Sequence, residues 1–160
     1  MKKILIVAMA DSVHTARWIR QFDDDEIEFV LFPSTPHRRI HPLISDHGLK
    51  TVKSKIMISK WMKRGGLPLG VLDLLLDNRI RARLLAKLIT AFDPDLIHVM
   101  ETQHSGYLTD RALSAISRKP KLVLSIWGSD LFWFQRFPKH QRKIRSFLKR
   151  VDLLVMECRR

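Results

Sequence analysis

Cysteine is almost absent from this chain of 160 residues, which contains only Cys158. One cysteine forms no disulfide within the chain and supplies no paired-cysteine zinc knuckle, so a disulfide-stapled scaffold and a cysteine zinc finger are excluded. Acidic residues are also scarce, with 16 Asp and Glu against 29 Lys and Arg, which makes the formal net charge +13 at pH 7. This charge predicts an anionic partner, such as a nucleic acid, a lipid headgroup or a phosphorylated small molecule.

Long hydrophobic runs are missing as well. The apolar stretch that follows Lys2 and Lys3 stops at Ala10, which is too short for a membrane span and marginal for a signal peptide. Apolar residues make up 46% of the chain and charged residues 28%, a composition typical of one soluble globular domain. Together with the single cysteine, these features predict a cytoplasmic protein.

Five short segments are apolar almost throughout and rich in β-branched residues, and each has the length of a strand. They are Ile4–Met9, Ile27–Phe32, Leu96–Met100, Leu122–Ile126 and Leu153–Met156. Because the apolar residues are continuous and do not alternate with polar ones, both faces of each strand are expected to be buried. A parallel sheet between two layers of helices has this pattern.

Segments with apolar residues at helical spacing lie between these strands. The first follows a candidate cap at Ser12 and places Ala16, Ile19 and Phe22 on one side. The other predicted helices span Val71–Phe92, Ser105–Ser117 and Lys139–Arg150. The alternation predicts a single α/β domain with a Rossmann-like, doubly wound parallel sheet flanked by helices.

Two parts of the chain are less regular. Residues 71–92 are expected to form one long helix or two helices kinked together, with Leu72, Leu75 and Leu76 on the apolar side and Arg81 among the charged residues around the remainder. Residues 37–68 are expected to be an irregular, basic and partly helical insertion.

Ligands of doubly wound sheets bind beyond the carboxyl ends of the strands. The loops at these ends lack the GxGxxG fingerprint, and the chain lacks the P-loop pattern GxxxxGKS/T, so a classical dinucleotide site is disfavoured and a P-loop NTPase is excluded. The loops carry Ser12, His14, Glu101, His104, Gly128 and Asp130. From the residues alone, substrate contact competes with structural roles: helix capping for Ser12 and Glu101, and solvent exposure for His14 and His104.

The other histidines are not expected to bind substrate or metal. His98 lies inside the third strand, where a buried, hydrogen-bonded imidazole is the common arrangement. The spacing of His37, His41 and His47 matches no compact metal site, and the chain has no convincing fourth ligand.

Six short motifs carry a resemblance to a known family. They are Lys3–Val7, Ser12–Trp18, Asp93–His98, Gln103–Tyr107, Trp127–Asp130 and Val151–Val155. In order and spacing, along nearly the whole chain, they resemble the N-terminal domain of retaining GT-B glycosyltransferases, the group with a glycosyltransferase subfamily four-like N-terminal domain.

The resemblance implies an enzyme of two Rossmann-like domains that face a cleft, with residues 1–160 as the acceptor-binding half. The implied reaction transfers a sugar from a nucleotide-sugar donor to a saccharide or lipid-linked acceptor in cell-surface glycan synthesis. The donor is a co-substrate and no further cofactor is implied. A C-terminal domain that is absent here would bind most of the nucleotide-sugar donor, so this chain alone is expected to be inactive.

The resemblance also bears on individual residues. The residues that it implies as substrate contacts are Ser12, His14, His104, Gly128 and Asp130, and the catalytic residues stay unassigned. Many members have a histidine where this chain has Trp127. No metal is expected.

Positive charge gathers toward the C-terminus, where residues 118–160 contain 12 Lys and Arg and three acidic residues. In the last predicted helix, the positions expected to contact a membrane are Arg142, Lys143, Arg145 and Lys149. Attraction to anionic lipid is worth on the order of 1 kcal/mol per basic residue near the surface. An anionic membrane surface is therefore an expected partner, with peripheral binding at the inner face of the cell membrane.

Two other functions stay open at the level of sequence. The chain could be the non-catalytic half of a split glycosyltransferase that acts with a separate donor-binding subunit. Its charge would also favour a basic nucleic-acid-binding α/β domain, but no recognised module supports that function, so no nucleic acid is expected.

Overall fold

The computed structural model describes residues 1–21, 26–35, 40–45, 50–51, 73 and 75–156. The strands in these ranges are β1 (Lys2–Ala8), β2 (Ile27–Pro33), β3 (Lys50–Thr51), β4 (Leu96–Met100), β5 (Lys121–Ile126) and β6 (Leu153–Met156). The helices are α1 (Val13–Ile19), α2 (Pro42–Ser45), α5 (Arg79–Phe92), α6 (Tyr107–Leu113), α7 (Ser129–Phe132) and α8 (Pro138–Leu148). A π-helical turn, η1 (Thr102–Gly106), and a 3₁₀ turn, η2 (Phe134–Arg136), complete the described elements.

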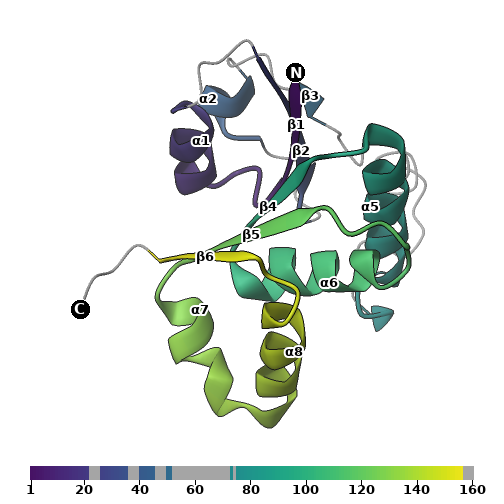
Figure 1. Cartoon of the computed structure of the whole chain (residues 1–160). Coiled ribbons are helices and arrows are strands. Elements are labelled where there is room, and N and C mark those ends of the chain that lie inside the picture. Colours follow the sequence, from purple (N-terminus) through teal and green to yellow (C-terminus); the bar gives the residue numbers. More distant parts are fainter. Residues whose placement is uncertain (22–25, 36–39, 46–49, 52–72, 74, 157–160) are drawn as a thin grey trace, which may run out of the picture.

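The strands form one sheet in the order β3-β2-β1-β4-β5-β6, and each neighbouring pair is parallel. In Figure 1, α1 and α2 lie on one side of this sheet, and α5 and α6 lie on the other. The predicted α/β domain with a Rossmann-like parallel sheet is therefore confirmed. All five predicted strands occur, and β3 is an additional one at the edge beside β2.

Strand β1 shows why the strand sequences are apolar without interruption. Leu5 and Val7 pack in the core cluster that includes residues of α5, α6 and α8, whereas Ile6 and Ala8 pack in the cluster that includes residues of α1 and α2. All four side chains are fully buried, because β1 lies between two helical layers and between two neighbouring strands. The chain continues from β1 to β2 on one side and later returns to β4 on the other, which creates a topological switch point beside β1.

The described part of residues 71–92 is not one long helix: Asp73 and Leu75 are helical and a turn separates them from α5, as in the alternative of two helices. Asp77 and Asn78 both adopt left-handed backbone conformations, with φ of 53° and 61°, and α5 begins only after them, at Arg79. Two consecutive left-handed residues cannot continue a right-handed helix. Leu75 and Leu76, expected on the apolar side, are consequently exposed, and Leu72 lies outside the described residues.

Strand β6 differs from the prediction of burial on both faces, since its four residues are all exposed. Their exposed fractions range from 41% for Leu154 to 60% for Met156. Strand β6 is the last strand in the order, and the described helices leave both of its faces uncovered. The predicted insertion at residues 37–68 lies mostly outside the described residues, and its described part contains α2 and β3.

Candidate functional site

The carboxyl ends of β1, β4 and β5 lie side by side at one edge of the sheet, because these strands are neighbours in it. The loops that leave them lead into α1, η1 and α7, respectively. This edge contains the switch point beside β1, which is where ligands of doubly wound sheets bind. The polar residues singled out in the sequence all come from these three loops.

Glu101 directly follows β4 and shapes the start of η1. Its backbone has φ of 75° and ψ of 152°, a conformation that costs a residue other than glycine about 1–3 kcal/mol. Its carboxylate Oε1 accepts hydrogen bonds from the backbone N–H groups of His104, at 2.6 Å, and Ser105, at 2.7 Å. Burial raises the pKa of Glu101, and these hydrogen bonds and the nearby His104 oppose the rise. A strained residue with a buried carboxylate therefore organises this turn.

Asp130 connects the β5 loop to the same turn. Its Oδ2 accepts hydrogen bonds from the backbone N–H of Thr102, at 3.2 Å, and of Trp127, at 3.4 Å. Its backbone carbonyl accepts a further hydrogen bond from the side-chain amide of Gln103, at 2.6 Å. The side chain is buried, and burial raises the pKa of Asp130 while the hydrogen bonds lower it. Asp130, expected to contact the substrate, thus lies beneath the surface and holds two loops together.

Residues of the β1 loop meet the β5 loop through an aromatic contact. Ser12 caps α1, with its Oγ accepting a hydrogen bond from the N–H of His14 at 3.2 Å. The exposed imidazole of His14 packs edge-on against Trp127, with a ring-centroid distance of 4.4 Å. The structure therefore brings His14 beside the position where many members of the resembled group have a histidine.

His104 and Gly128 occupy the exposed part of this edge. Gly128 has φ of 45°, and a Cβ built on it would meet no atom within 4 Å, so the space beside it is open. His104 projects from η1, and its proximity opposes the rise in the pKa of both Glu101 and Asp130. The five residues predicted as substrate contacts divide accordingly: His14, His104 and Gly128 reach the surface, while Ser12 and Asp130 organise the loops.

At this edge the imidazoles of His14 and His104 are available for hydrogen bonding. Nearby, burial raises the pKa values of the carboxyl groups of Glu101 and Asp130. Such groups exchange protons at a higher pH than free carboxyl groups do, a property that binding and catalytic sites share. A π-helical turn such as η1 is rare and frequently marks a functional site. Within the described residues, no three His, Cys, Asp or Glu side chains converge as metal ligands.

His98 lies apart from this chemistry, inside β4. Its Nε2 forms a hydrogen bond with Ser125 Oγ at 2.8 Å, and its ring packs edge-on against Trp18 at a centroid distance of 4.2 Å. Burial lowers the pKa of His98 to about 4, so the ring is neutral at physiological pH. These contacts match the structural role predicted for His98.

Arg81 supports the neighbouring β2 loop, a role that the sequence analysis missed. Its buried guanidinium donates hydrogen bonds to the carbonyl oxygens of Pro33 and Ser34, and burial lowers the pKa of Arg81 to about 10. The signal was present in the spacing, because Arg81 precedes the buried Leu85 and Ile89 by one and two helical turns. The prediction placed Arg81 among the charged residues around the helix and therefore did not identify it as a buried donor.

The comparison with protein families supports the Rossmann-like α/β fold. A family model described as glycosyl transferase 4-like matches residues 3–157. The chain belongs to the glycosyl transferase 4-like family. No curated protein matches it. The resemblance carried by the six motifs is thereby confirmed, and this glycosyl transferase 4-like domain is assigned, at a coarse level, to the transferases that move sugars.

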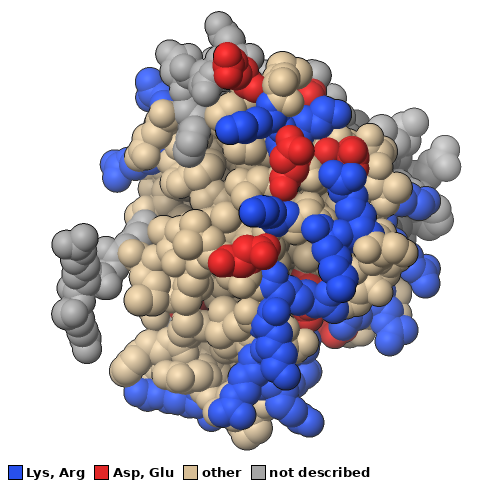
Figure 2. All heavy atoms as spheres, in the orientation of Figure 1, with Lys and Arg blue, Asp and Glu red and all other residues tan. Residues whose placement is uncertain are grey.

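A second notable surface of the glycosyl transferase 4-like domain is basic. In Figure 2, Lys and Arg side chains form a band across the face that carries α6 and α8. Helix α8 contains no acidic residue, and of its predicted membrane contacts Arg142 and Arg145 are exposed, as is Lys149 at its C-terminal cap. Lys143 is half-buried and forms an ion pair with Asp77. Among the described helices, none combines the length and the apolar character needed to cross a membrane.

Exposed aromatic residues lie next to this basic helix, in the segment from α7 through η2. Phe132 is 61% exposed, Trp133 51% and Phe137 46%. The guanidinium of Arg136 lies over the rings of Phe132 and Trp133, at 4.8 and 5.2 Å from their centroids. Large aromatic side chains and the Arg136 cation therefore share one exposed patch at the start of α8. We call this patch, taken together with the exposed cations of α8, the aromatic–basic surface: Phe132, Trp133, Arg136, Phe137, Arg145 and Lys149.

Proposed function

We propose that this glycosyl transferase 4-like domain is the acceptor-binding half of a retaining GT-B glycosyltransferase. In this proposal a saccharide or lipid-linked acceptor binds at the carboxyl ends of β1, β4 and β5, and a second domain binds most of the nucleotide-sugar donor. The observation that carries the proposal is the convergence of His14, His104 and the buried carboxyl groups of Glu101 and Asp130 beside the switch point.

The proposed role of this edge is to hold an acceptor hydroxyl in line for transfer. The imidazoles of His14 and His104 are exposed and can donate or accept hydrogen bonds with sugar hydroxyls. The partly exposed ring of Trp127 offers an apolar surface for the face of a sugar ring. Glu101 and Asp130 hold the loops rigid, and positioning of a reactant in the reactive geometry can supply a large part of a rate enhancement.

Saturation-transfer NMR with a panel of monosaccharides and disaccharides tests this proposal. We expect transfer to at least one sugar, and we expect the His14→Ala and His104→Ala variants to reduce it at least fivefold. Lys87→Ala, an exposed change on α5, is the control and should leave the signal unchanged. Equal signals from the two histidine variants, the control and the unchanged protein would refute binding at this edge.

We further propose that the domain docks on anionic membranes through the aromatic–basic surface. Tryptophan and phenylalanine favour the interfacial layer of a bilayer, and cations favour its anionic headgroups. The exposure of Phe132, Trp133 and Phe137 beside an acid-free helix supports this docking, because large exposed aromatic groups are otherwise unfavourable in water. Such docking would bring the sheet edge close to a lipid-linked acceptor.

Flotation with vesicles of graded anionic lipid content measures the docking. Two variants separate its components: Phe132→Ser with Trp133→Ser removes the aromatic groups, and Arg145→Glu with Lys149→Glu reverses the charge. Each should lower vesicle binding by tenfold or more, and only binding of the charge variant should become insensitive to salt. Arg83→Glu with Lys87→Glu, an equal charge change on α5, is the matched control. Equal losses from control and test variants would refute a local docking surface.

A further inference from the structure

A polar groove lies between the start of α5, the outer side of α6 and α8. Its volume is about 390 Å³, and the residues that line it are Asp77, Asn78, Tyr107, Asp110, Arg111, Ser114, Arg142, Lys143 and Ser146. None of these residues belongs to the three strand-end loops or to the aromatic–basic surface. The groove is therefore a separate feature, and nothing in the proposed acceptor site accounts for it.

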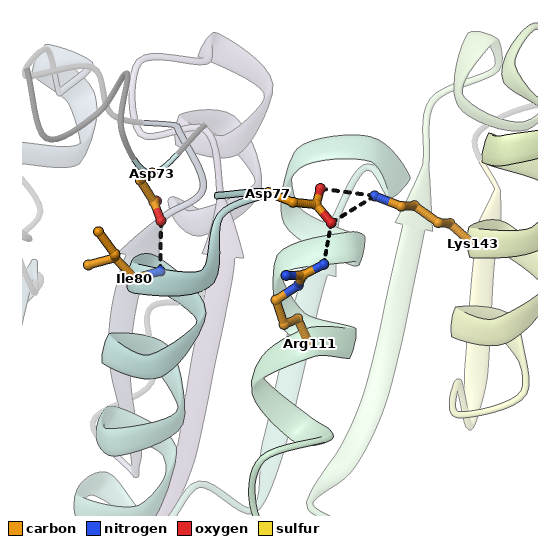
Figure 3. A network of polar contacts seen from close by, with 5 residues as sticks. All are labelled: Asp73, Asp77, Ile80, Arg111 and Lys143. Carbon is orange, nitrogen blue, oxygen red and sulfur yellow. Dashed lines mark hydrogen bonds and ion pairs between the residues drawn. The ribbon is translucent and has the colours of Figure 1, made fainter. Parts of the chain in front are cut away.

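Three cationic side chains line this groove, and a single carboxylate forms ion pairs with two of them. The Asp77 carboxylate forms ion pairs with Arg111 and with Lys143, the latter at 3.1 Å (Figure 3). Lys143 also lies 5.2 Å from the centroid of the Tyr107 ring. The second acidic residue of the groove, Asp110, forms its ion pair with Arg150, at 2.7 Å. Arg142 has no ion pair with a carboxylate among the described residues, so the groove retains an excess of positive charge.

Asp77 is a partner that another anion can replace. Its side chain is 53% exposed, and ion pairs at such exposure typically stabilise a fold by less than about 1 kcal/mol. Both Asp77 and Asn78 hold left-handed backbone conformations, which are unfavourable for residues with side chains even though Asp and Asn tolerate them best. Burial alone would raise the pKa of Asp77, but Lys143, Arg111 and Lys139 outweigh it and hold the pKa below its ordinary value. The carboxylate is thus fully ionised and occupies a strongly positive position.

We propose that this groove is a binding site for a phosphate group carrying two negative charges, and that Asp77 occupies its cationic centre when no such ligand is bound. A dianion matches the charge of Arg111, Arg142 and Lys143 better than one carboxylate does. Guanidinium groups bind phosphate oxygens through paired, charge-assisted hydrogen bonds. The hydroxyl group of Ser146 lines the same groove as a further donor. The ligand is a phosphomonoester, either free in solution or in a lipid headgroup.

Titration with inorganic phosphate, followed by amide NMR shifts at constant ionic strength, tests the site directly. Asp77→Asn removes the competing charge while keeping the shape, so we expect it to bind phosphate about tenfold more tightly than the unchanged protein. Arg142→Gln with Lys143→Gln should bind at least tenfold more weakly. Arg83→Gln with Lys87→Gln is the matched control, because it removes the same charge from exposed positions of α5 outside the groove.

The outcomes separate a ligand site from a structural ion-pair network. Tighter binding by Asp77→Asn cannot arise from misfolding, so it supports the site even if the double variant is unstable. Unchanged or weaker binding by Asp77→Asn, or equal weakening by the groove variant and the control, would overturn the proposal. Vesicles with phosphatidic acid, compared with phosphatidylglycerol vesicles of equal charge density, identify the source. A gain on phosphatidic acid for Asp77→Asn assigns a lipid phosphomonoester, and a gain on inorganic phosphate alone assigns a soluble ligand.

Discussion

Acidification should destabilise this domain through His98, and the effect can be isolated by one substitution. The imidazole is 3% exposed and forms a hydrogen bond with Ser125 Oγ, and burial lowers its pKa from 6.5 to about 4. Because the pKa in the folded state lies below the pKa in the unfolded state, the unfolded chain takes up a proton first as the pH falls. The free energy of unfolding therefore decreases between about pH 6.5 and pH 4.

The size of this effect follows from the two pKa values. At pH 5 the unfolded imidazole is protonated almost completely and the folded one scarcely at all, which corresponds to a loss of about 2 kcal/mol relative to pH 7.5. The buried carboxyl groups of Glu101 and Asp130 act with the opposite sign, because their pKa values are raised in the folded state. A difference between two proteins that share these carboxyl groups cancels their contribution.

Urea unfolding of the unchanged protein and of His98→Gln at pH 7.5, 6 and 5 measures that difference. We expect the unchanged protein to lose about 2 kcal/mol more than the variant between the two extremes. Ser125→Ala, which keeps the imidazole and removes its hydrogen-bond partner, should retain the full pH dependence. If the two curves for the unchanged protein and His98→Gln stay parallel, the imidazole is not held neutral by burial and the reasoning fails.

Three further substitutions test other parts of the structure by urea unfolding. Gly106→Ala places a Cβ 2.9 Å from the ring of Phe147 and should lower the free energy of unfolding by about 1–3 kcal/mol. Adding Phe147→Leu should restore part of this free energy, and no restoration would contradict the predicted clash. Arg81→Met leaves two buried carbonyl oxygens without donors and should cost about 3 kcal/mol, and a loss below about 1 kcal/mol would show that the β2 loop does not depend on it. Leu154→Lys on the exposed strand β6 should change stability by less than about 0.5 kcal/mol, and a larger loss would mean that this strand is covered in solution.

The strands were predictable because burial on two faces leaves a distinctive mark on sequence. A segment such as Leu96–Met100 has apolar residues in succession, and its bounds in β4 are those predicted. The start of α5 was not predictable in the same way. Leu75 and Leu76 continue the helical spacing, but the left-handed residues Asp77 and Asn78 separate them from α5. At this turn the Asp77 carboxylate accepts hydrogen bonds from side chains of α6 and α8, which are distant in the sequence.

The candidate site was predictable in location and only partly in the roles of its residues. The strand ends were found because the order of strands and helices fixes where the carboxyl ends of a parallel sheet lie. The burial of Asp130 was not foreseen, since it depends on the amides of Thr102 and Trp127, which come from two different loops. The contact of His14 with Trp127 joins residues more than a hundred positions apart, and spacing along the chain carries no sign of it.

The sequence by itself determined the class of fold, the strand ends that form the candidate site and the sign of the charge. Hydrophobic continuity, helical spacing and residue counts are local properties, and each has a direct physical consequence. Only the tertiary structure decided which charges are neutralised and which stay free, as at Asp77, where cations from α6 and α8 meet the start of α5. Long side chains from separate helices converge there because the helices pack on one sheet, and that packing depends on the whole chain.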